Sequence, residues 1–594
     1  MIVKTRDLLN HIRCRRFAAL ARRSQLISID DDEKLWSFGL RPNELHHFEQ
    51  NTEGASPDFQ QPLYRQVMSH YHDEFRGLVR DTIIQSGCRL VNEKKELRIQ
   101  FNDDMTLSGW VDFMADSSDS RNIYFVRPAS SRILLQEKYS YAKQRVAFFY
   151  PDEKGFYQIR IPADYSLATT DFWRKLMQLC SPWEVSGRLI YDIAFHNYLL
   201  HKDYPRTRFK LLVAMINSDA VLDKNKPGTE FVSLFDLTFV ADQFEQRIET
   251  DLYRMINHIE LDDDSPVDLV KNACQRNTTT ACPFIENCFM HVPKKNSIFA
   301  YLQQHLGFRE GPSKTDPLHD TYEMINSGMV HMLDVPISWL QREKNLMQRY
   351  CVENKFLFLN KKKIKAKLAT LVYPLYFLDF EAFPAPLPRY QGEKAFQQSV
   401  FQFSVHRLTS PAKDFDRNNC EHWEYVAPID RDHRRELVEY LCQAIPEGES
   451  SIVVYNQTFE EQRLQELADL FPEYRQRLDN MISRLFDLLK VLKNDYAFYS
   501  EHGFSKLESS TYNFYHPELS GSYSLKAVLP VFTEDKYKKL AIQNGTAAYL
   551  TYASSQFDPE IDQEATFNDL KAYCAQDTLA LVEILKAIER RLEK

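Results

Sequence analysis

Two acidic residues inside an almost wholly apolar run restrict the fold of this chain more than any other feature. The run LVYPLYFLDFEAF covers residues 371–383 and has the composition of a buried strand that ends with Asp379 and Glu381. Residues two apart on a strand point to the same face. Buried carboxylates are costly unless something pairs with them, and hard oxygen ligands favour divalent cations. The run therefore predicts a site for a divalent metal ion.

Length and composition indicate a large globular protein. The chain has 594 residues, too many for one hydrophobic core, so we expect two or three domains. No apolar run reaches the roughly 18–20 residues that span a bilayer. The basic, amphipathic start resembles a first helix more than a secretion signal, with a mitochondrial presequence as the alternative. We expect a cytoplasmic protein with no membrane partner.

Charge and glycine patterns exclude several classes of protein. The net charge of −9 argues against a bulk polyanion binder, although local basic grooves are compatible with it. The clusters RCRR (13–16) and KKKIKAK (361–367) are either such grooves or solvated helix faces. The chain has no GK[ST] phosphate loop and no GxGxxG motif, which argues against a nucleotide-driven motor or a Rossmann dehydrogenase.

Hydrophobic patterns divide the chain into two α/β halves joined by a connector. In residues 1–299, strands are expected at 97–101, 109–114, 122–127 and 210–216, and helices at 191–202 and 242–261. Residues 300–370 are predicted to form a helical connector. From 371 onward we expect strands at 371–383, 396–408, 421–428 and 450–456, a helix at 431–445, and helices to the end. This order predicts an α/β domain with a mixed sheet at 371–594.

Further acidic residues follow in settings that match the first pair. Asn456 ends the strand 450–456, and Glu460 lies in the first turn of the next helix. Tyr573 and Asp577 are four apart, so a helix presents them on one face. A set of salt-bridged acids on a solvated surface is the alternative, but it does not explain why Asp379 ends an apolar strand.

These motifs resemble the DEDD exonuclease superfamily of the ribonuclease-H-like fold. Its three motifs are matched, in order, at Asp379-Phe380-Glu381, at Asn456 to Glu460 and, in the Tyr form, at Tyr573 to Asp577. The chain departs from the second motif because Glu460 replaces the usual Asp. The segment GSYSLKAVLP (521–530) also looks like the serine–leucine helix start that precedes the third motif.

The resemblance implies hydrolysis from the 3′ end of a nucleic acid by a mechanism that uses two Mg²⁺ or Mn²⁺ ions. Asp379 would bridge both ions, Glu381 and Asp577 would complete one shell, and Glu460 would support the other. Tyr573 would orient or deprotonate the attacking water. Residues within or near the motifs would contact the nucleic acid, namely Phe380, Gln402, Asn456, Ser524 and Lys526.

The cysteines predict a second metal centre. Cys274, Cys282 and Cys288 share one Pro-containing loop, and Cys14 can supply a fourth ligand. Thiolates favour an iron–sulfur cluster or zinc, and the alternative is that these residues are ordinary small hydrophobes. One early and three late cysteines resemble the iron–sulfur staple of RecB-like PD-(D/E)XK nucleases. That resemblance implies a 4Fe–4S cluster, with Zn²⁺ as the alternative.

The first half departs from the RecB-like catalytic pattern. Asp112 fits the first acidic position, but the next strand has Phe125-Val126-Arg127 where that family has E-x-K. The helix that follows offers His196 to Leu200 in place of Q-x-x-x-Y. Phe cannot bind Mg²⁺ and Arg cannot act as a base. We expect a degenerate nuclease domain retained as a scaffold or for nucleic-acid binding, unless a substitute acid such as Glu96 or Glu137 restores cleavage.

The whole arrangement resembles a bacterial family known as domain of unknown function 2779. The resemblance rests on Tyr376 to Glu381, Phe401 to Ser404 with His406, Tyr455 to Glu460, and Tyr573 to Thr578. It implies a RecB-like, restriction-endonuclease-like half with cysteines, followed by a ribonuclease-H-like exonuclease half. It implies no established substrate.

An aromatic segment and a pair of histidines can each be interpreted in two ways. The aromatic residues between 494 and 523 either stack on unpaired bases or pack beneath a long loop; they are Tyr496, Phe498, Tyr499, Phe504, Tyr512, Phe514, Tyr515 and Tyr523. His46 and His47 are either a nuclease-family motif or a helix-surface pair. The remaining cysteines are expected in the core, with Cys574 on the packed side of its helix; the others are Cys88, Cys180, Cys351, Cys420 and Cys442.

The prediction as a whole is a metal-dependent exonuclease acting on single-stranded nucleic acid, with DNA favoured over RNA. The alternative is a non-catalytic nucleic-acid-binding or scaffold protein in which both halves are inactive. Protein partners cannot be inferred from these patterns.

Overall fold

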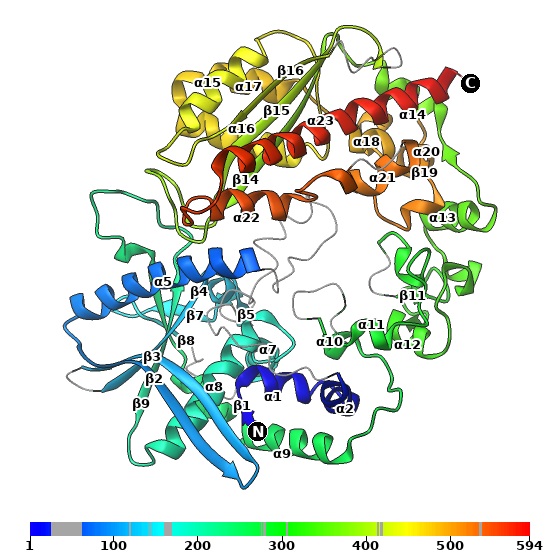
Figure 1. Ribbon diagram of the computed structural model, residues 1–594. Coiled ribbons are helices and arrows are strands. Elements are labelled where there is room, and N and C mark those ends of the chain that lie inside the picture. The colour runs from blue at the N-terminus through cyan, green and yellow to red at the C-terminus, as the bar shows by residue number, and fades with distance from the viewer. Residues whose placement is uncertain are drawn as a thin grey trace. The chain divides into compact units, whose positions relative to one another are not determined.

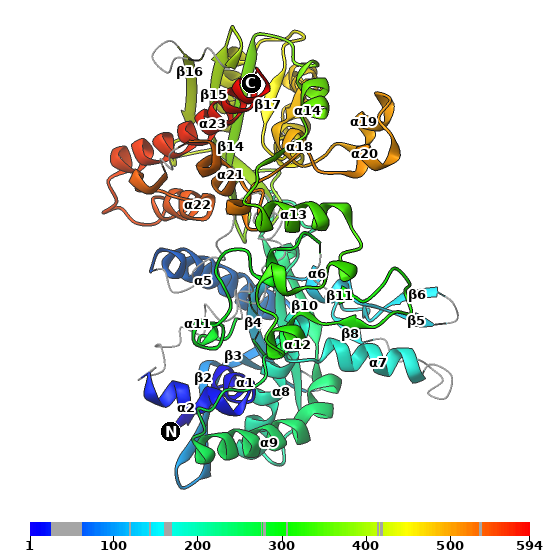
Figure 2. The same cartoon turned by 90° about the vertical axis from the view of Figure 1, so that its right-hand side faces the viewer.

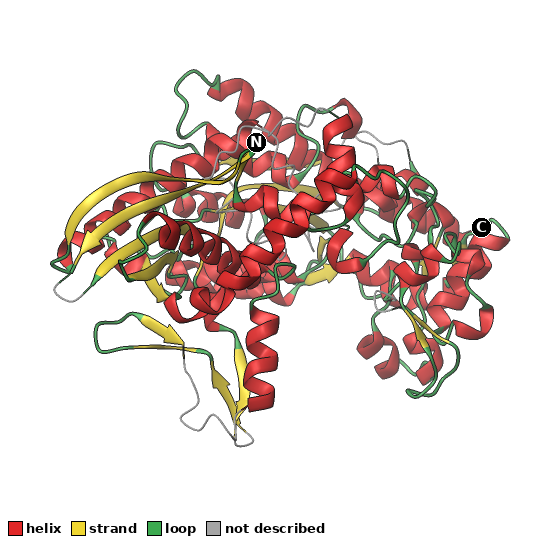
Figure 3. Cartoon of the chain, turned by 90° about the horizontal axis from the view of Figure 1, so that it is seen from below, coloured by secondary structure: helices red, strands yellow, loops and turns green. Residues whose placement is uncertain are grey.

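The protein is mixed α/β, with several sheets and many helices (Figures 1 and 3). The structure is a computed structural model that describes residues 1–24, 62–117, 120–141, 144–159, 169–274, 276, 281–303, 307–412, 415, 420–533 and 537–593. His46 and His47 lie outside these residues. Within the described ranges, no helix has the length and apolar character needed to cross a membrane.

The chain forms two compact units. Among the described residues, the first unit contains the chain up to Asn287 together with Pro384–Gln397, and the second contains Cys288–Phe383 and everything from Gln398 onward. The predicted connector 300–370 thus belongs to the second unit. It consists of short segments, including α12 (Thr321–Asn326), α13 (Glu343–Glu353) and α14 (Lys361–Leu368).

A single large sheet organises the first unit. Its strand order is β1 (Ile2–Val3), β3 (Met105–Asp116), β4 (Arg121–Ser130), β9 (Phe209–Ile216), β10 (Val232–Asp236), β8 (Tyr157–Ile159) and β7 (Phe149–Pro151), with β2 (Arg89–Asn102) paired to β3. β2, β3 and β4 pair antiparallel in succession, and β4 pairs parallel with β9. The strands predicted in this half are confirmed, because each lies within β2, β3, β4 or β9.

Helices surround this sheet, and one of them forms the centre of the core. The longer helices are α1 (Thr5–His11), α2 (Arg15–Arg23), α5 (Pro62–Gln85), α7 (Thr169–Leu179), α8 (Val185–Asp203) and α9 (Thr238–Leu261). The predicted helices 191–202 and 242–261 are confirmed within α8 and α9. Residues 186–200 of α8 are all buried, as expected for a helix that is apolar on most sides.

A loop from late in the sequence completes the first unit. The residues after β14 (Leu375–Pro384) return to the connection between β9 and β10. There the Leu222 amide donates to the Glu393 carbonyl at 2.8 Å, and the Gly392 amide donates to the Leu222 carbonyl at 3.0 Å. The strand that carries Asp379 and Glu381 therefore leads directly into a loop of the other unit.

The sheet of the second unit has five strands. Their order is β16 (Glu421–Val426), β15 (Gln398–Leu408), β14, β17 (Ile452–Val454) and β18 (Leu485–Asp487). Helices α15 (Arg434–Ala444), α16 (Thr458–Leu470) and α17 (Arg475–Ser483) cover one face, and α23 (Gln563–Glu593) crosses the other (Figures 1 and 2). The predicted strands and the helix 431–445 are confirmed.

Alternation along β14 separates its two faces. Tyr376, Leu378 and Phe380 belong to the hydrophobic cluster that also contains residues of α15 and α16. The intervening positions, which include Asp379 and Glu381, face the opposite side, toward α23. The expectation that Asp379 ends the strand is wrong, since β14 continues to Pro384.

The last part of the chain contains strands where only helices were expected. β18 has three residues, and β19 (Phe514–Tyr515) pairs with β13 (Phe358–Leu359). Segments this short have no alternation that a sequence pattern can reveal. The remaining helices are α18 (Leu488–Leu492), α19 (Tyr496–Glu501), α20 (Lys506–Ser510), α21 (Leu525–Phe532) and α22 (Gly545–Ser554).

The lysine cluster on α14 is not simply a solvated face. Lys363 is fully buried and its Nζ donates to Asn494 Oδ1 at 3.0 Å and to the Thr511 carbonyl at 2.7 Å. This ammonium lies 4.3 Å from the centre of the Tyr499 ring. Buried side chains in the aromatic segment 494–523 include Tyr499, Phe514, Tyr515 and Tyr523, whereas Tyr496 is 49% exposed. Most of this aromatic segment is thus packed, as its second interpretation expected.

Candidate metal centre

Asp379 and Glu381 lie where β14 outruns its parallel neighbour. Tyr376 pairs with Ile452 and Phe377 with Val453, and β17 ends one residue later. The two acidic residues therefore follow the end of the parallel pairing, at the carboxyl edge of these strands. Ligand sites in α/β sheets form at such edges.

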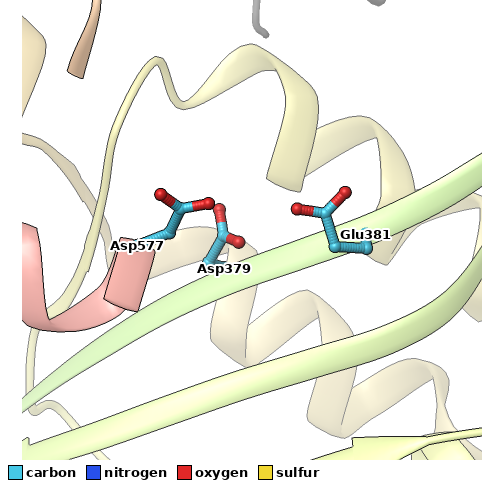
Figure 4. A group of neighbouring side chains, drawn as sticks. All are labelled: Asp379, Glu381 and Asp577. Carbon is cyan, nitrogen blue, oxygen red and sulfur yellow. The ribbon is translucent and has the colours of Figure 1, made fainter. Parts of the chain in front are cut away.

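Asp577 approaches the same place from α23. One carboxylate oxygen from each of Asp379, Glu381 and Asp577 lies within 4.8 Å of the others. Figure 4 shows Asp379 and Glu381 on the same side of β14, with the Asp577 carboxylate turned toward that of Asp379. Residues almost two hundred positions apart in sequence thus share one site.

Glu460 completes the acidic set from a third element. It lies in the first turn of α16 and is 3% exposed, and its Oε2 is buried without a hydrogen-bond partner. The turn into α16 passes through Asn456, which has a left-handed φ of 67°. Asn tolerates this conformation better than most residues. Its amide donates to Asp487 Oδ1 at 3.0 Å, which fixes the start of the helix that presents Glu460.

A small cavity lies between these side chains. Its volume is about 50 Å³, which exceeds the roughly 10–15 Å³ needed for one water molecule. The lining residues come from β14, the β17–α16 turn, α16, α21 and α23; they are Asp379, Phe380, Glu381, Tyr455, Phe459, Glu460, Leu525, Lys526, Tyr573 and Asp577. The cavity can hold a cation with its remaining water ligands.

The electrostatics of the cavity favour binding of positive charge. Burial, and next the charge of Asp577, raise the pKa of Asp379 well above its usual range. Burial, Asp379 and Asp577 do the same to the pKa of Glu381, and burial and Asp379 to that of Glu460. Burial also raises the pKa of Asp577, although Lys526 opposes this rise. Several buried carboxylates with one lysine among them are the donor set of a divalent metal site.

Tyr573 and Lys526 form the polar wall opposite β14. Lys526 Nζ lies 3.3 Å from the Tyr573 hydroxyl. Burial, followed by the charges of Asp577 and Glu381, raises the pKa of Tyr573 well above its usual value. The phenol therefore keeps its proton at neutral pH, which favours the orienting role over the deprotonating role.

Two residues at the site were not identified from the sequence as contacts of these acids. The Tyr537 hydroxyl donates to Asp577 Oδ1, and Cys574 Sγ lies 3.4 Å from Asp379 Oδ2. Cys574 is buried, as expected, but its packed side faces Asp379. Its place inside the third motif could have signalled this contact. Tyr537 follows no motif, so only the fold reveals it.

Three predicted nucleic-acid contacts lie outside the cavity lining: Asn456, which forms the turn before α16, Gln402 and Ser524. Gln402 is fully buried and donates from Nε2 to the Leu570 carbonyl at 2.8 Å. Ser524 caps α21 by accepting a hydrogen bond from the Ala527 amide. Gln402 and Ser524 hold elements in place, whereas Phe380 and Lys526 line the cavity itself.

Polar residues of β15 fix α23 against the sheet. Ser404 Oγ and His406 Nδ1 lie 2.9 Å and 2.8 Å from Thr578 Oγ1. Together with the bond from Gln402 to Leu570, they form a ladder of alternate β15 residues along α23. Because Thr578 directly follows Asp577, this ladder sets how the acid meets β14.

Three of the four predicted thiol ligands share one neighbourhood in the first unit. The Cys282 amide donates to the Cys274 carbonyl at 3.0 Å. Burial raises the pKa of Cys282 to about 11; the Arg13 guanidinium lowers it, and Cys14 and Cys274 raise it. Cys288 ends the short helix α11 (Ile285–Cys288) and falls in the second unit.

An arginine neutralises the acid pair of the first unit. Arg127 Nη2 donates to Asp192 Oδ2 at 2.6 Å, and its Nη1 lies 3.4 Å from Asp112 Oδ2. Asp192 also accepts from Thr5, and Asp112 from the Val126 amide. The guanidinium therefore occupies the place between the two acids that a cation would take.

Comparisons with known proteins find one family of unknown function and several uncharacterized bacterial proteins to which parts of this chain are similar. Residues 376–524 match the family described as "Domain of unknown function (DUF2779)". The uncharacterized protein UU173 of Ureaplasma parvum is 24% identical over 234 residues, covering 37% of this chain and 31% of that protein. The uncharacterized protein MG366 of Mycoplasma genitalium is 26% identical over 274 residues, covering 43% and 37%. The chain spans about a third of the length of these curated relatives, and no solved structure matches it.

Proposed function

We propose that this protein is a metal-dependent nuclease that hydrolyses single-stranded nucleic acid at the cavity of its second unit. The observation that carries the proposal is the convergence of four carboxylates from β14, α16 and α23, of which Glu381, Glu460 and Asp577 are buried and Asp379 is half-buried. Within the described residues, Lys526 is the cation that lines their cavity. Buried acids without matching positive charge are expensive, and they persist where they serve a function.

The residues fit a divalent cation. Asp379, Glu381 and Asp577 present oxygens within 4.8 Å of one another, and Glu460 Oε2 is buried without a partner. These four side chains would hold one or two Mg²⁺ or Mn²⁺ ions. Such ions, when bound, polarise a phosphoryl oxygen and lower the pKa of bound water.

Other side chains of the cavity would orient the attacking water and bind the phosphate. Tyr573 keeps its proton and donates a hydrogen bond, so it orients the water that attacks phosphorus. Lys526 offers its ammonium group to a phosphate oxygen. Leu525 supplies apolar surface at the cavity wall. The second unit would thus be a ribonuclease-H-like exonuclease domain that acts from the 3′ end, with DNA favoured.

For the first unit we propose a RecB-like scaffold with a thiol-bound cofactor. The neutralised pair of Asp112 and Asp192 supports the absence of catalysis there. The neighbourhood of Cys14, Cys274 and Cys282 supports an iron–sulfur cluster or zinc. Metal analysis and visible absorption of the anaerobically purified protein test this centre independently of hydrolysis.

The experiment compares the wild type with Asp379→Asn on single-stranded DNA and RNA labelled at either end, with Mn²⁺ or EDTA. We expect the wild type to release nucleotides from the 3′ end only with Mn²⁺, and Asp379→Asn to be at least about 100-fold slower. Asp469→Asn, which changes an exposed acid on α16 paired with Arg475, is the matched control.

The outcomes separate the rival functions. A wild type no faster than Asp379→Asn contradicts the proposal and favours a non-catalytic binding or scaffold protein. Cleavage that survives Asp379→Asn moves the activity to the first unit, where Glu96 or Glu137 would be the acids to change.

A further inference from the structure

We propose that Tyr537 is a positioning residue of the metal centre, whose hydroxyl holds one oxygen of Asp577 so that the carboxylate faces the cation. This inference rests on the proposed function and adds a residue that belongs to none of its three motifs. Tyr537 begins the short 3₁₀ turn Tyr537–Lys539, between α21 and α22.

The contacts of Tyr537 support this role. Its hydroxyl donates to Asp577 Oδ1, and its side chain is 5% exposed. The ring lies 6.4 Å from that of Tyr573, and Lys526 Nζ lies 5.3 Å from the centre of each ring. Two tyrosines therefore flank Lys526. The Tyr537 hydroxyl donates to Asp577 Oδ1, and the Tyr573 hydroxyl also lowers the pKa of Asp577 by hydrogen bonding.

The geometry of a carboxylate ligand explains why such a tie matters. Asp577 is mounted on one helix, whereas Asp379 and Glu381 are mounted on one strand, so their mutual orientation depends on tertiary contacts. In Figure 4, one oxygen of Asp577 points toward Asp379 and the other points away. A hydrogen bond to one oxygen stops rotation of the group and leaves the other for the metal.

Tyr537 and Tyr573 then have different tasks. Tyr573 lines the cavity, where it can reach the attacking water, whereas Tyr537 acts through Asp577. Removal of the Tyr537 hydroxyl should weaken metal binding, because hydrogen bonds to ligands typically contribute a factor of about 10–100 to metal affinity. Removal of the Tyr573 hydroxyl should lower kcat with a smaller change in metal affinity.

The test measures Mn²⁺ binding and hydrolysis separately. Mn²⁺ affinity is determined by calorimetry without nucleic acid for the wild type, Tyr537→Phe, Tyr573→Phe and Tyr552→Phe. Tyr552 is the control, since this buried tyrosine of α22 stacks on Phe401 at 4.0 Å. We expect Tyr537→Phe to bind Mn²⁺ about 10-fold or more weakly, and to regain most of its hydrolysis at saturating Mn²⁺.

A second variant guards against a fold defect. Tyr537→His keeps a ring that can donate a hydrogen bond, so it should restore part of the lost affinity. An Mn²⁺ affinity of a folded Tyr537→Phe equal to that of the wild type would overturn the inference while the proposed function stands. A wild type that neither binds Mn²⁺ nor hydrolyses nucleic acid would instead overturn the proposed function.

Discussion

At the residue scale, the acidic cluster lowers the stability of the protein. Asp379, Glu381, Glu460 and Asp577 repel one another in a buried cavity, so the protein without metal carries an unfavourable electrostatic energy. Residues that a catalytic site needs are often those that destabilise the fold.

This repulsion makes Asp379→Asn a stabilising change when no metal is present. We expect its free energy of unfolding in EDTA to exceed that of the wild type by about 0.5–2 kcal/mol, because one buried charge is removed from the cluster. Mn²⁺ should then stabilise the wild type but not the variant. Urea unfolding with EDTA and with Mn²⁺ measures both effects; a variant less stable than the wild type in EDTA would show that Asp379 is a structural acid.

Arg127 has the opposite relation to its acids. We expect Arg127→Met to lower the free energy of unfolding by about 3–5 kcal/mol, since it removes the guanidinium that pairs with the buried Asp192 and the half-buried Asp112. The double variant with Asp192→Asn should recover part of this loss. Equal unfolding midpoints for Arg127→Met and the wild type would contradict the assignment of Arg127 as an internal cation.

At the element scale, the site depends on how α23 lies on the sheet. The ladder from β15 ends at Thr578, whose hydroxyl meets both Ser404 and His406. Thr578→Val keeps the shape of the side chain but removes these hydrogen bonds. We expect a loss of about 1–3 kcal/mol in unfolding free energy and slower hydrolysis, because Asp577 is the preceding residue.

The matched control for Thr578→Val is Thr566→Val, the same change in the first turns of α23. We expect this control to retain wild-type hydrolysis. Activity of Thr578→Val indistinguishable from that of Thr566→Val, with both proteins folded, would exclude the ladder as a determinant of the site.

The elements show which parts of the structure a sequence can reveal. Alternation and apolar runs predicted β14, β15, β16 and α15, because these segments are long enough to have a period. Spacing within motifs also predicted which acids would meet. The same patterns did not show that Asp379 lies inside β14 and not at its end, since the ends of a strand depend on pairing with neighbouring strands.

Sequence patterns also do not show which side chains meet when separate elements pack together. Tyr537 reaches Asp577 only because the turn after α21 folds back onto α23. The resemblance to RecB-like nucleases predicts that Arg127 stands where that family has a lysine, but the bonds of Arg127 to Asp112 and Asp192 require the packing of α8 against β3 and β4. Gln402 was expected to contact nucleic acid, yet burial turns its amide toward α23.

At the scale of the whole molecule, each unit places two acidic side chains close together, but their surroundings differ. Each brings an acid on a strand, Asp112 or Asp379, together with an acid on a helix, Asp192 or Asp577. The first unit supplies its own cation with Arg127. In the second unit, Lys526 is the cation among the described residues that line the cavity, and our proposal assigns the remaining positive charge to a bound metal ion.

Acid unfolding should therefore reveal the ion pair of the first unit. Arg127 holds the pKa of Asp192 below its ordinary value of 3.8, although burial opposes this effect. A depressed carboxyl pKa contributes stability above the unfolded value, and that stability disappears as the pH falls through the folded value. We expect Asp192→Asn to be less stable than the wild type at neutral pH, with a difference that shrinks below about pH 4.

Urea unfolding of both proteins at a series of pH values, in EDTA throughout, measures this difference. A stability gap that stays constant from neutral pH to about pH 2 would show that Asp192 contributes by packing rather than by charge.

The most direct test of the central claim is the anomalous difference map of a crystal soaked in Mn²⁺. The account predicts manganese peaks bounded by Asp379, Glu381 and Asp577, with Glu460 beside them, and no manganese between Asp112 and Asp192. A map with no manganese at the four acids of the second unit, from crystals that take up the ion elsewhere, would contradict the account.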